Sequence, residues 1–492
     1  MLPSNPSGHT AYQDFLFAQL PVHYPNPKVL DSQTWQIIER FYQLDLSHID
    51  EMMKDRYSVF GPEPRPPSSM LRCILVALSF QVSSYTKWAR QLKINPLYAI
   101  LSGFNLGDTP GIGTFYDFHK RLWLNDDNNF TPNIKPPKIS VSKPKKSGDK
   151  AESVEKVSVD DLLIQFQQLP PASVQPQSLL FEIFNAQFLA ESVNQDLIKP
   201  EAICLAGDGT PVVTSAQMRK KRLCSCFNEG IQDCQCDRRF SQPDCDIGWD
   251  SHRKTFYHGY DLYLLTDATS DNDLPIFPFL SPASRHDSHG FVHTFFHMQA
   301  HLPQFNVDSL LLDSAHDAMP LYVYCSDNNI TPFIDLNNKR GTLLKYKDDL
   351  TIDHDGVPIC KQGFRMRRDG TEPKKFRLKF RCPLMNREHG NSCPNPCSDA
   401  KFGKTVHLAM KDNPRIFNIP PRDSNAWKLQ YNNRTSAERA NKRIKIDYLL
   451  ENGNHRSSRE WYCRLFAILM SLHLDAWNLP QFDLQNRLRQ AS

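Results

Sequence analysis

The chain has 492 residues, of which 40% are hydrophobic, and its 58 Lys and Arg residues nearly balance its 54 Asp and Glu residues. This length predicts about two to four domains, and the composition is sufficient for buried cores. No run of about 18 apolar residues occurs, so we expect no membrane partner. The first residues lack the basic start and apolar core of a secretory signal, which predicts a cytoplasmic protein.

The net charge of +4 neither demands nor forbids a nucleic-acid partner, because the distribution of charge matters more than its sum. Basic residues gather in three clusters in one half of the chain, which favours a polyanionic partner over three solvated faces. The clusters are Arg219, Lys220, Lys221 and Arg222; Arg365, Arg367, Arg368, Lys374, Lys375, Arg377, Lys379 and Arg381; and Arg439, Lys442, Arg443 and Lys445.

The first part of the chain is predicted to be helical. In residues 28–125, short segments repeat apolar residues at spacings of three and four, as in a helical domain of the DNA-binding type. A helical domain without a DNA role stays open as the alternative. Residues 126–158 are rich in proline and lysine and cannot bury enough apolar surface to order themselves, so we expect a linker. A helical connector is predicted at 159–200.

From residue 201 the chain alternates short apolar runs with helical stretches, which predicts an α/β domain with a mixed sheet. The predicted strands are 203–209, 257–267, 309–315 and 330–336, and the predicted helices are 288–301, 435–452 and 459–478. We assign 201–337 and 425–480 to this domain. Residues 338–424 are predicted to form a mainly β insertion that is basic and contains cysteines, with a basic strand face near 374–381.

Two aspartates follow apolar runs of this domain. Asp208 comes after the run 203–207, and Asp313 comes after the run 309–312. A carboxylate at the end of a buried strand is costly unless a metal or a partner neutralises it, and α/β folds collect ligands at strand ends. A turn or cap residue is the alternative at each position. The neighbouring His316 and Asp317 are expected to support Asp313.

A third feature is the segment 431–451. Its Tyr431, Arg434, Glu438 and Lys445 are separated by three, four and seven residues, which places them on one face of a helix. An exposed ion-pair face is the alternative. Two aspartates and a glutamate would suit a pair of hard cations about 3.5–4 Å apart, as phosphodiester transfer requires. Arginine and lysine would hold phosphates.

The spacing Tyr431-x2-Arg434-x3-Glu438-x6-Lys445 resembles the Tyr-Arg-Glu-Lys motif of bacterial insertion-sequence transposases of the DDE class. The residues around Asp208 (Asp-Gly-Thr) and Asp313 (Leu-Leu-Leu-Asp-Ser-Ala) also resemble the segments that carry the two aspartates in that family. The resemblance covers about residues 28–123, which look like the N-terminal helical domain attached to such transposases, and residues 200–478.

This resemblance implies a ribonuclease-H-like catalytic domain in which Asp208, Asp313 and Glu438 bind Mg²⁺, for which Mn²⁺ can substitute. The residues implied to contact DNA are Tyr431, Arg434, Arg439, Lys442 and Lys445. The implied reaction cleaves transposon ends and joins the 3′-hydroxyl to target DNA by two-metal-ion phosphoryl transfer.

The implied partner is double-stranded DNA, both terminal inverted repeats and target, bound by a homodimer at the nucleoid of a bacterial cell. Two alternatives stay open. One is a metal-dependent nuclease of the same fold, and the other is a domesticated transposase that only binds DNA.

The 13 cysteines are an odd number in a chain without a secretory signal, which argues against a disulfide framework. Cys360, Cys382, Cys393 and Cys397 resemble part of a zinc ribbon and are candidate ligands of a structural Zn²⁺. A second set repeats Cys-x-Cys, an unusual spacing for one tetrahedral zinc. It comprises Cys224, Cys226, Cys234, Cys236 and Cys245. Reduced thiols are the alternative for both sets. Asp287, a further acidic residue, fits a helix start better than a metal ligand.

Overall fold

The computed structural model describes residues 8–124 and 157–491. Short gaps within these ranges lie at 59, 62, 172–173, 217–220, 223, 227, 233–234, 237, 241, 338–343, 347–349, 354, 387–389, 402, 453–454 and 481–482. The predicted linker 126–158 lies outside the described residues except for its last two. In the described part of the chain, every helix is too short or too polar to span a bilayer.

The N-terminal region is helical, as predicted. Its helices are α1 (His9–His23), α2 (Ser32–Gln43), α3 (Ser47–Met52), α4 (Pro67–Ser79), α5 (Tyr85–Ile94), α6 (Pro96–Leu101) and α7 (Ile112–Leu122), with 3-10 turns at Pro27–Val29 and Lys54–Arg56. Helix α4 is buried over nearly its whole length and forms the centre of the region. The Asp31 and Ser84 side chains accept hydrogen bonds from the backbone of the first turns of α2 and α5.

A serine and a threonine near the start of two helices do not cap them. Ser68 lies inside α4, which begins at Pro67, and its hydroxyl donates to Asp50 instead of capping the helix. Thr114 lies inside α7, which begins at Ile112. Proline suits the first turn of a helix because its missing N–H has no partner there in any case, so α4 can begin at Pro67.

The centre of the molecule is a six-stranded mixed sheet, as predicted. Its strands are β1 (Ile203–Val213), β4 (Asp246–Asp250), β5 (Thr255–Asp267), β6 (Pro275–Pro282), β7 (Val307–Leu312) and β8 (Thr331–Ile334). The order is β4-β5-β1-β7-β8, and β6 also pairs with β5. Strand β5 runs antiparallel to β1, β4 and β6, whereas β7 is parallel to β1 and β8 is parallel to β7.

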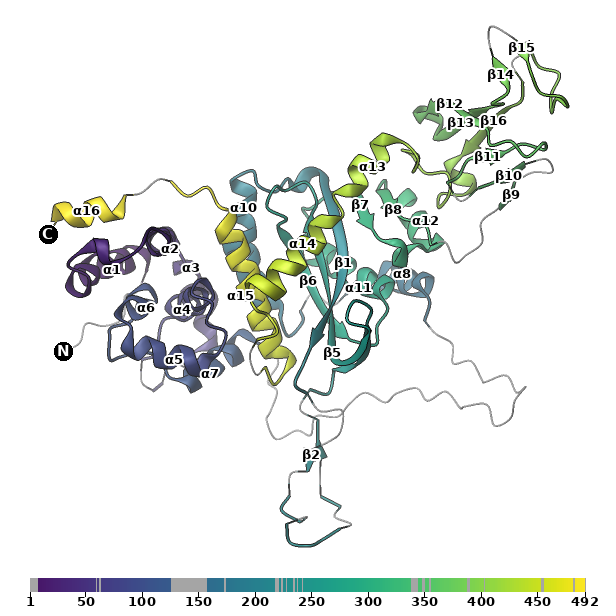
Figure 1. The fold of residues 1–492 in the computed structure, drawn as a ribbon. Helices are drawn as coiled ribbons and strands as arrows, with labels where there is room; N and C mark the ends of the chain where they lie inside the picture. The colour runs from purple at the N-terminus through teal and green to yellow at the C-terminus, as the bar shows by residue number, and fades with distance from the viewer. Residues whose placement is uncertain are drawn as a thin grey trace.

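Helices cover both faces of this sheet (Figure 1). On one face α11 (Asp287–His301) packs on β5 and β6, backed by α8 (Val159–Gln168), which also contacts α12 (Met319–Asp327). On the other face α14 (Thr435–Lys442) packs on β1 and β5 and continues from α13 (Asn425–Asn432) into a π-helical turn at Arg443–Asp447. Helices α9 (Ser178–Phe184) and α10 (Ala190–Asn194) flank a second π turn at Asn185–Leu189, and a 3-10 turn at Pro200–Ala202 leads into β1.

Helix α15 (Ser458–Ala476) joins the helical region to the sheet. It contacts α4 and α7 on one side and α9 and β6 on the other, and most of its residues are buried. Helix α16 (Leu484–Ala491) then returns to the N-terminal helices, where Leu488 lies beside Leu20 and Trp35. Both ends of the chain therefore lie at the same end of the molecule (Figure 1).

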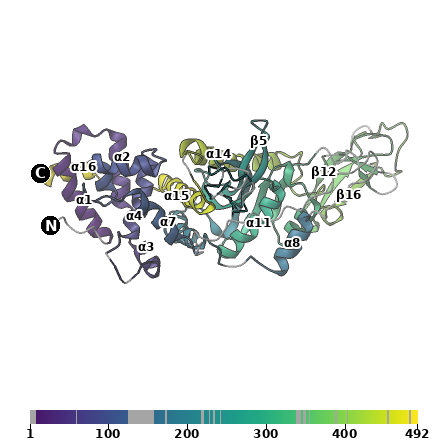
Figure 2. The same ribbon diagram turned by 90° about the horizontal axis from the view of Figure 1, so that it is seen from below.

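The insertion between β8 and α13 has its own hydrophobic core, centred on Ile352, Leu378 and Leu408. Its strands are β9 (Leu344–Tyr346), β10 (Leu350–Ile352), β11 (Pro358–Ile359), β12 (Arg367–Glu372), β13 (Arg377–Arg381), β14 (Met385–Asn386), β15 (Gly390–Asn391) and β16 (Thr405–Ala409), with 3-10 turns at Pro373–Lys375 and Met410–Asp412. Figure 2 shows the insertion at the opposite end of an elongated molecule from the N-terminal helices.

A second, smaller insertion leaves the sheet between β1 and β4. It is a two-stranded ribbon of β2 (Lys221–Arg222) and β3 (Arg238–Arg239), which projects away from the body of the protein (Figure 1).

Candidate active site

Asp208 lies in the middle of β1. The strand continues to Val213, so Asp208 marks the point where its fully buried half ends and not the end of the strand itself. The Asn441 side chain donates a hydrogen bond of 3.0 Å to Asp208 Oδ2. Burial raises the pKa of Asp208 to about 6; the bond from Asn441 opposes this rise, and the negative charges of Glu438 and Asp313 add to it. The three predicted carboxylates are therefore close enough to interact.

Asp313 follows β7, the strand parallel to β1, and caps the 3-10 turn Ser314–His316. It accepts hydrogen bonds from the Ala315 backbone at 3.0 Å and from His316 Nδ1 at 2.6 Å. His316 is buried, and its Nε2 lies 2.8 Å from the Tyr263 hydroxyl. Burial raises the pKa of Asp313, but these hydrogen bonds and the charge of Arg434 outweigh it and bring the pKa below its ordinary value. Asp313 is thus held as a carboxylate.

The segment 431–451 is not one continuous helix. Helix α13 ends at Asn432, α14 begins at Thr435, and the π-helical turn follows Lys442. Tyr431, Arg434 and Glu438 lie close together despite this break. Arg434 Nη2 lies 2.7 Å from Glu438 Oε1, and the Arg434 guanidinium lies 5.8 Å from the centre of the Tyr431 ring. Tyr431 in turn stacks on Trp427, with ring centres 4.4 Å apart.

Small residues let α14 approach the sheet closely. Ser436, Ala437 and Ala440 are buried against it, and the Ser436 hydroxyl lies 3.1 Å from that of Thr266 on β5. This close packing brings Asn441 within hydrogen-bonding distance of Asp208. The contribution of Asn441 was not predicted, although its position three residues after Glu438 places it on the same helix face.

The other residues predicted to contact DNA differ in how many hydrogen bonds and ion pairs they form within the protein. Lys445 Nζ donates to the Pro211 carbonyl at 2.6 Å and pairs with Glu451 at 3.3 Å, and its side chain is only 14% exposed. Arg439 pairs with Asp273 at 2.5 Å. Lys442 is exposed and makes no hydrogen bond or ion pair within the described residues. Lys445 thus holds the end of β1 and is poorly placed for phosphate.

The glycines beside Asp208 show that α11 covers the opposite face of the sheet. A Cβ on Gly207 would lie 2.7 Å from the Tyr263 hydroxyl, and one on Gly209 would lie 3.1 Å from Asp287 Oδ1. Glycine leaves the room that these side chains occupy. Asp287, the first residue of α11, therefore lies across the sheet from the α14 face.

Asp261 also lies on the α11 face, because it pairs with Pro211 in the same register in which Gly209 pairs with Tyr263. It was not predicted. Burial raises the pKa of Asp261 well above its ordinary value, and the charges of Asp287 and Asp208 add to this rise. Burial therefore favours the neutral form of the Asp261 carboxyl.

The donor set on the α14 face suits a hard divalent cation. Carboxylate oxygens are the ligands that Mg²⁺ and Mn²⁺ prefer. Asn441 Oδ1 is buried and accepts no hydrogen bond from the described residues. In this part of the chain the oxygens of Asp208, Asp313 and Glu438 do not all lie within 4.8 Å of one another. Glu438 instead pairs with Arg434, at 2.7 Å.

The two cysteine sets differ in geometry. Cys360, Cys382, Cys393 and Cys397 line one cavity of about 10 Å³ in the insertion, but no three of their sulfurs lie within 4.8 Å of one another among the described residues. Burial and the neighbouring Cys360 raise the pKa of the Cys397 thiol. In the second set, by contrast, the sulfurs of three cysteines do lie within 4.8 Å of one another. These are Cys224, Cys226 and Cys236.

The two other members of the second set are Cys234 and Cys245. Cys234 lies outside the described residues. Cys245 is buried at the base of the ribbon, where its sulfur lies 3.5 Å from the Gln242 side chain.

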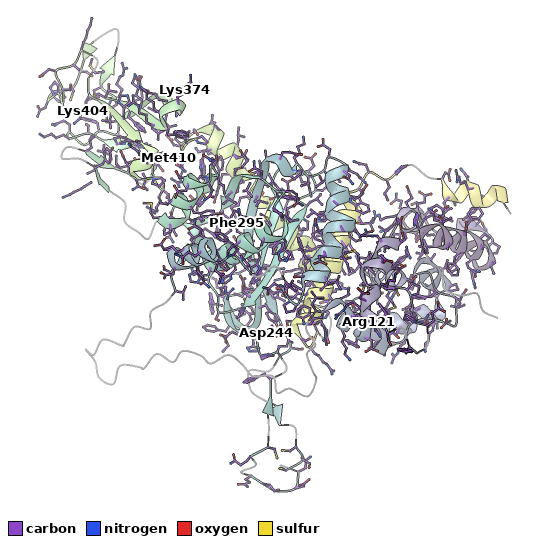
Figure 3. All side chains as sticks on the ribbon, turned by 180° about the vertical axis from the view of Figure 1, so that it is seen from behind. Arg121, Asp244, Phe295, Lys374, Lys404 and Met410 are labelled. Carbon is purple, nitrogen blue, oxygen red and sulfur yellow. The ribbon has the colours of Figure 1, made fainter. Side chains whose placement is uncertain are left out.

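A cavity of about 630 Å³ opens between α12 and the insertion, where Cys325 and Met410 line it. None of the site carboxylates lines this cavity. Met410 and Lys374 are labelled on the insertion in Figure 3, seen from behind.

Comparison with protein families concerns the N-terminal helices. Residues 27–121 match the family model of a transposase domain (DUF772), a range that includes α2 to α6 and most of α7. The N-terminal helical region is thus similar to a transposase domain. No curated protein matches the chain. The matched range belongs to the helical region and not to the sheet, so the domain supports a transposase without assigning roles to Asp208, Asp313 or Glu438.

Burial of the Asp208 carboxylate predicts that its replacement by asparagine changes the stability of this protein. Because its folded-state pKa of about 6 lies above the ordinary 3.8, the stabilisation is full below 3.8 and is lost as the pH rises through about 6. In metal-free buffer at about pH 8, Asp208→Asn should therefore raise the free energy of unfolding by roughly 2–3 kcal/mol, and at about pH 4 the two proteins should be alike.

Urea unfolding in the presence of a chelator measures this difference. Asp313→Asn is the matched control and should not stabilise the protein, because the pKa of Asp313 lies below its ordinary value. If Asp208→Asn were no more stable than the wild type at about pH 8, burial of the Asp208 carboxylate would not lower the free energy of unfolding.

Proposed function

We propose that this transposase belongs to the DDE class and that Asp208, Asp313 and Glu438 bind Mg²⁺ in a ribonuclease-H-like catalytic domain. The observation that carries the proposal is the meeting of these carboxylates from two neighbouring parallel strands and the helix packed over them. Asp313 follows the end of β7, a position at which ligands commonly bind in α/β sheets, and Asp208 lies on the neighbouring strand β1. The mixed sheet with helices on both faces supports the proposed fold.

The chain's own residues would prepare this site for phosphoryl transfer. His316 and Asn441 orient Asp313 and Asp208 through the hydrogen bonds described above. Arg434 has a planar guanidinium that can hold a phosphate through two hydrogen bonds. The ring of Tyr431 lies against this guanidinium, with its centre 5.8 Å away. When bound, the two cations would stabilise the charge that develops on the attacking and leaving oxygens.

The proposed reaction cuts DNA at the ends of the transposon and joins the freed 3′-hydroxyl to a target strand. The proposed partners are the terminal inverted repeats and the target duplex, bound by a homodimer that bridges two ends. The basic strand β13 of the insertion would contribute to binding. Its Lys379 and Arg381 are paired with Asp369 at 2.9 and 2.8 Å, so DNA would compete with this carboxylate.

A strand-transfer experiment tests this function. Labelled duplexes that end in the inverted repeat flanking the gene are incubated with the protein, Mg²⁺ and a plasmid target. The expected product is label joined covalently to the plasmid through the 3′ end. Cleavage without joined product would favour a nuclease, and binding without cleavage would favour a domesticated DNA-binding protein.

Arg434→Ala is expected to weaken binding of the transposon end about 10–100-fold, because a charge-assisted phosphate contact contributes about 1.5–3 kcal/mol. The slope of affinity against salt should also fall by about one phosphate contact. Fluorescence anisotropy at several salt concentrations measures both quantities.

Arg439→Ala on the same helix removes the same charge and serves as the control. Its guanidinium is already engaged by Asp273, so a smaller loss of affinity is expected. If Arg434→Ala bound the transposon end as tightly as the wild type, Arg434 and Glu438 would form a surface ion pair without a role in DNA binding.

We also propose that Cys360, Cys382, Cys393 and Cys397 hold a structural Zn²⁺ in the insertion. They come from separate parts of it and line a cavity of about 10 Å³, which has room for a single ion. Thiolates are the ligands of structural zinc sites, which are closed and four-coordinate.

A further inference from the structure

Among the residues that the structure describes, the ribbon between β1 and β4 shows no hydrophobic core around its cysteines. Between Cys224 and Cys236, none of the described side chains is buried, and Ile231 is 48% exposed. Ordering a loop of this length costs conformational entropy, which apolar burial normally offsets. Small elements without a core usually depend on a disulfide or a metal.

The strands of the ribbon cannot supply the missing stability. In the described part of the ribbon β2 and β3 pair at two positions, Lys221 with Arg239 and Arg222 with Arg238. Like charges at paired positions of neighbouring strands are destabilising. Figure 3 shows the ribbon beyond the labelled Asp244, clear of the body of the protein, so contacts with the sheet do not hold its tip.

The tip instead gathers three thiols. The sulfurs of Cys224, Cys226 and Cys236 all lie within 4.8 Å of one another, and those of Cys226 and Cys236 are 3.6 Å apart. This separation is far longer than the roughly 2.05 Å of a disulfide bond. It is close to the edge of about 3.8 Å that a tetrahedron has when Zn–S bonds measure about 2.3 Å.

We propose that Cys224, Cys226 and Cys236 bind a Zn²⁺ ion that fixes the tip of the ribbon. Each thiol releases one proton to solvent and binds the ion as a thiolate, so binding releases three protons. The two cysteines that follow β2 and the one that precedes β3 would be joined through the ion, which would close the loop between the two strands.

This site is separate from the one proposed for the insertion and does not depend on the catalytic proposal. The Cys-x-Cys spacing alone is unusual for one zinc. The structure explains it, because the hairpin brings the second strand back beside the first and supplies Cys236 from across the turn.

The test measures zinc per chain in the full-length protein by elemental mass spectrometry. The double variant C226S/C236S is expected to contain one zinc fewer than the wild type. The matched control is Cys245→Ser, which removes a buried thiol at the base of the ribbon and should keep the wild-type content. The difference between variants is decisive, because an ion in the insertion would remain in all three proteins.

A second measurement on the wild type needs no variant. Alkylation followed by peptide mapping compares the protein with added Zn²⁺ and the protein treated with a chelator. Protection of Cys224, Cys226 and Cys236 by zinc, lost with the chelator, is expected. An unchanged zinc content in C226S/C236S, or alkylation of these thiols at the same rate in both conditions, would overturn the proposal.

Discussion

Asp313→Asn is expected to lower metal-dependent DNA cleavage about 10³-fold or more while end binding stays nearly unchanged. Asparagine can still accept the hydrogen bond from the Ala315 backbone, so the turn after β7 should keep its shape. What disappears is the negative charge that a divalent cation requires. A metal ligand at a phosphoryl-transfer site contributes several kcal/mol to the transition state, which corresponds to this loss of rate.

Asp287→Asn provides the matched control for this change. It removes an aspartate charge from the opposite face of the sheet, where Gly209 separates it from Asp208. Cleavage by this variant should stay within a small factor of the wild type, as measured by gel analysis of single-turnover reactions. Cleavage retained in Asp313→Asn would remove Asp313 from the set of metal ligands.

Asp317→Ala is expected to lower the free energy of unfolding by about 3–5 kcal/mol, the usual cost of breaking a buried ion pair. The Asp317 side chain is fully buried, and Arg415 donates two hydrogen bonds to it at 2.7 and 2.6 Å. The Tyr322 hydroxyl and the Asn337 backbone also donate to Asp317. Alanine would leave the Arg415 guanidinium without its carboxylate.

This network anchors the returning end of the insertion. Arg422 donates to the Ile334 carbonyl at the end of β8 and to the Tyr322 hydroxyl, both at 3.0 Å. The chain then enters α13 and α14, so loosening the anchor should also reduce cleavage by shifting Glu438.

Urea unfolding measures the effect of Asp317→Ala, with Asp117→Ala as the control. Asp117 forms an exposed pair with Lys120 at 3.5 Å, and its loss should change the free energy of unfolding by no more than about 0.5 kcal/mol. If both variants lose equally little, the buried pair does not anchor the insertion.

Apolar periodicity was a sufficient guide to the helical N-terminal region and to the mixed sheet. The runs before Asp208 and Asp313 are buried on both faces, which makes them continuous in apolar residues. The second half of β1 was missed because its residues 209–213 are mostly half-buried and alternate weakly. They join the sheet by pairing with β5, a partner that lies about fifty residues away in sequence.

The helix motif shows what spacing alone cannot provide. Neither Asn433 nor Arg434 is a residue type that breaks helices. The sequence therefore predicts one continuous helix, whereas the structure has two. Spacing also treats Lys445 as available for phosphate, whereas the π-helical turn brings it to Glu451 and to the end of β1. The spacing of residues on one helix face does not reveal contacts of this kind with other parts of the fold.

The cysteines illustrate the same limit. Spacing favoured the set in the insertion as the zinc ligands, yet the closer approach of sulfurs is at the tip of the β2–β3 ribbon. Which sulfurs lie close together depends on how β2 and β3 pair, and the Cys-x-Cys spacing does not predict that pairing.

The most direct test of the catalytic site compares the wild type with Glu438→Gln in a cleavage assay. The substrate is the DNA that flanks the gene, incubated with Mg²⁺ or Mn²⁺. Glutamine keeps the shape of the side chain but loses the charge that pairs with Arg434. The account predicts metal-dependent cuts at an inverted repeat by the wild type and none by the variant. Equal cleavage by both proteins would contradict it, since Glu438 would then have no part in holding the metal.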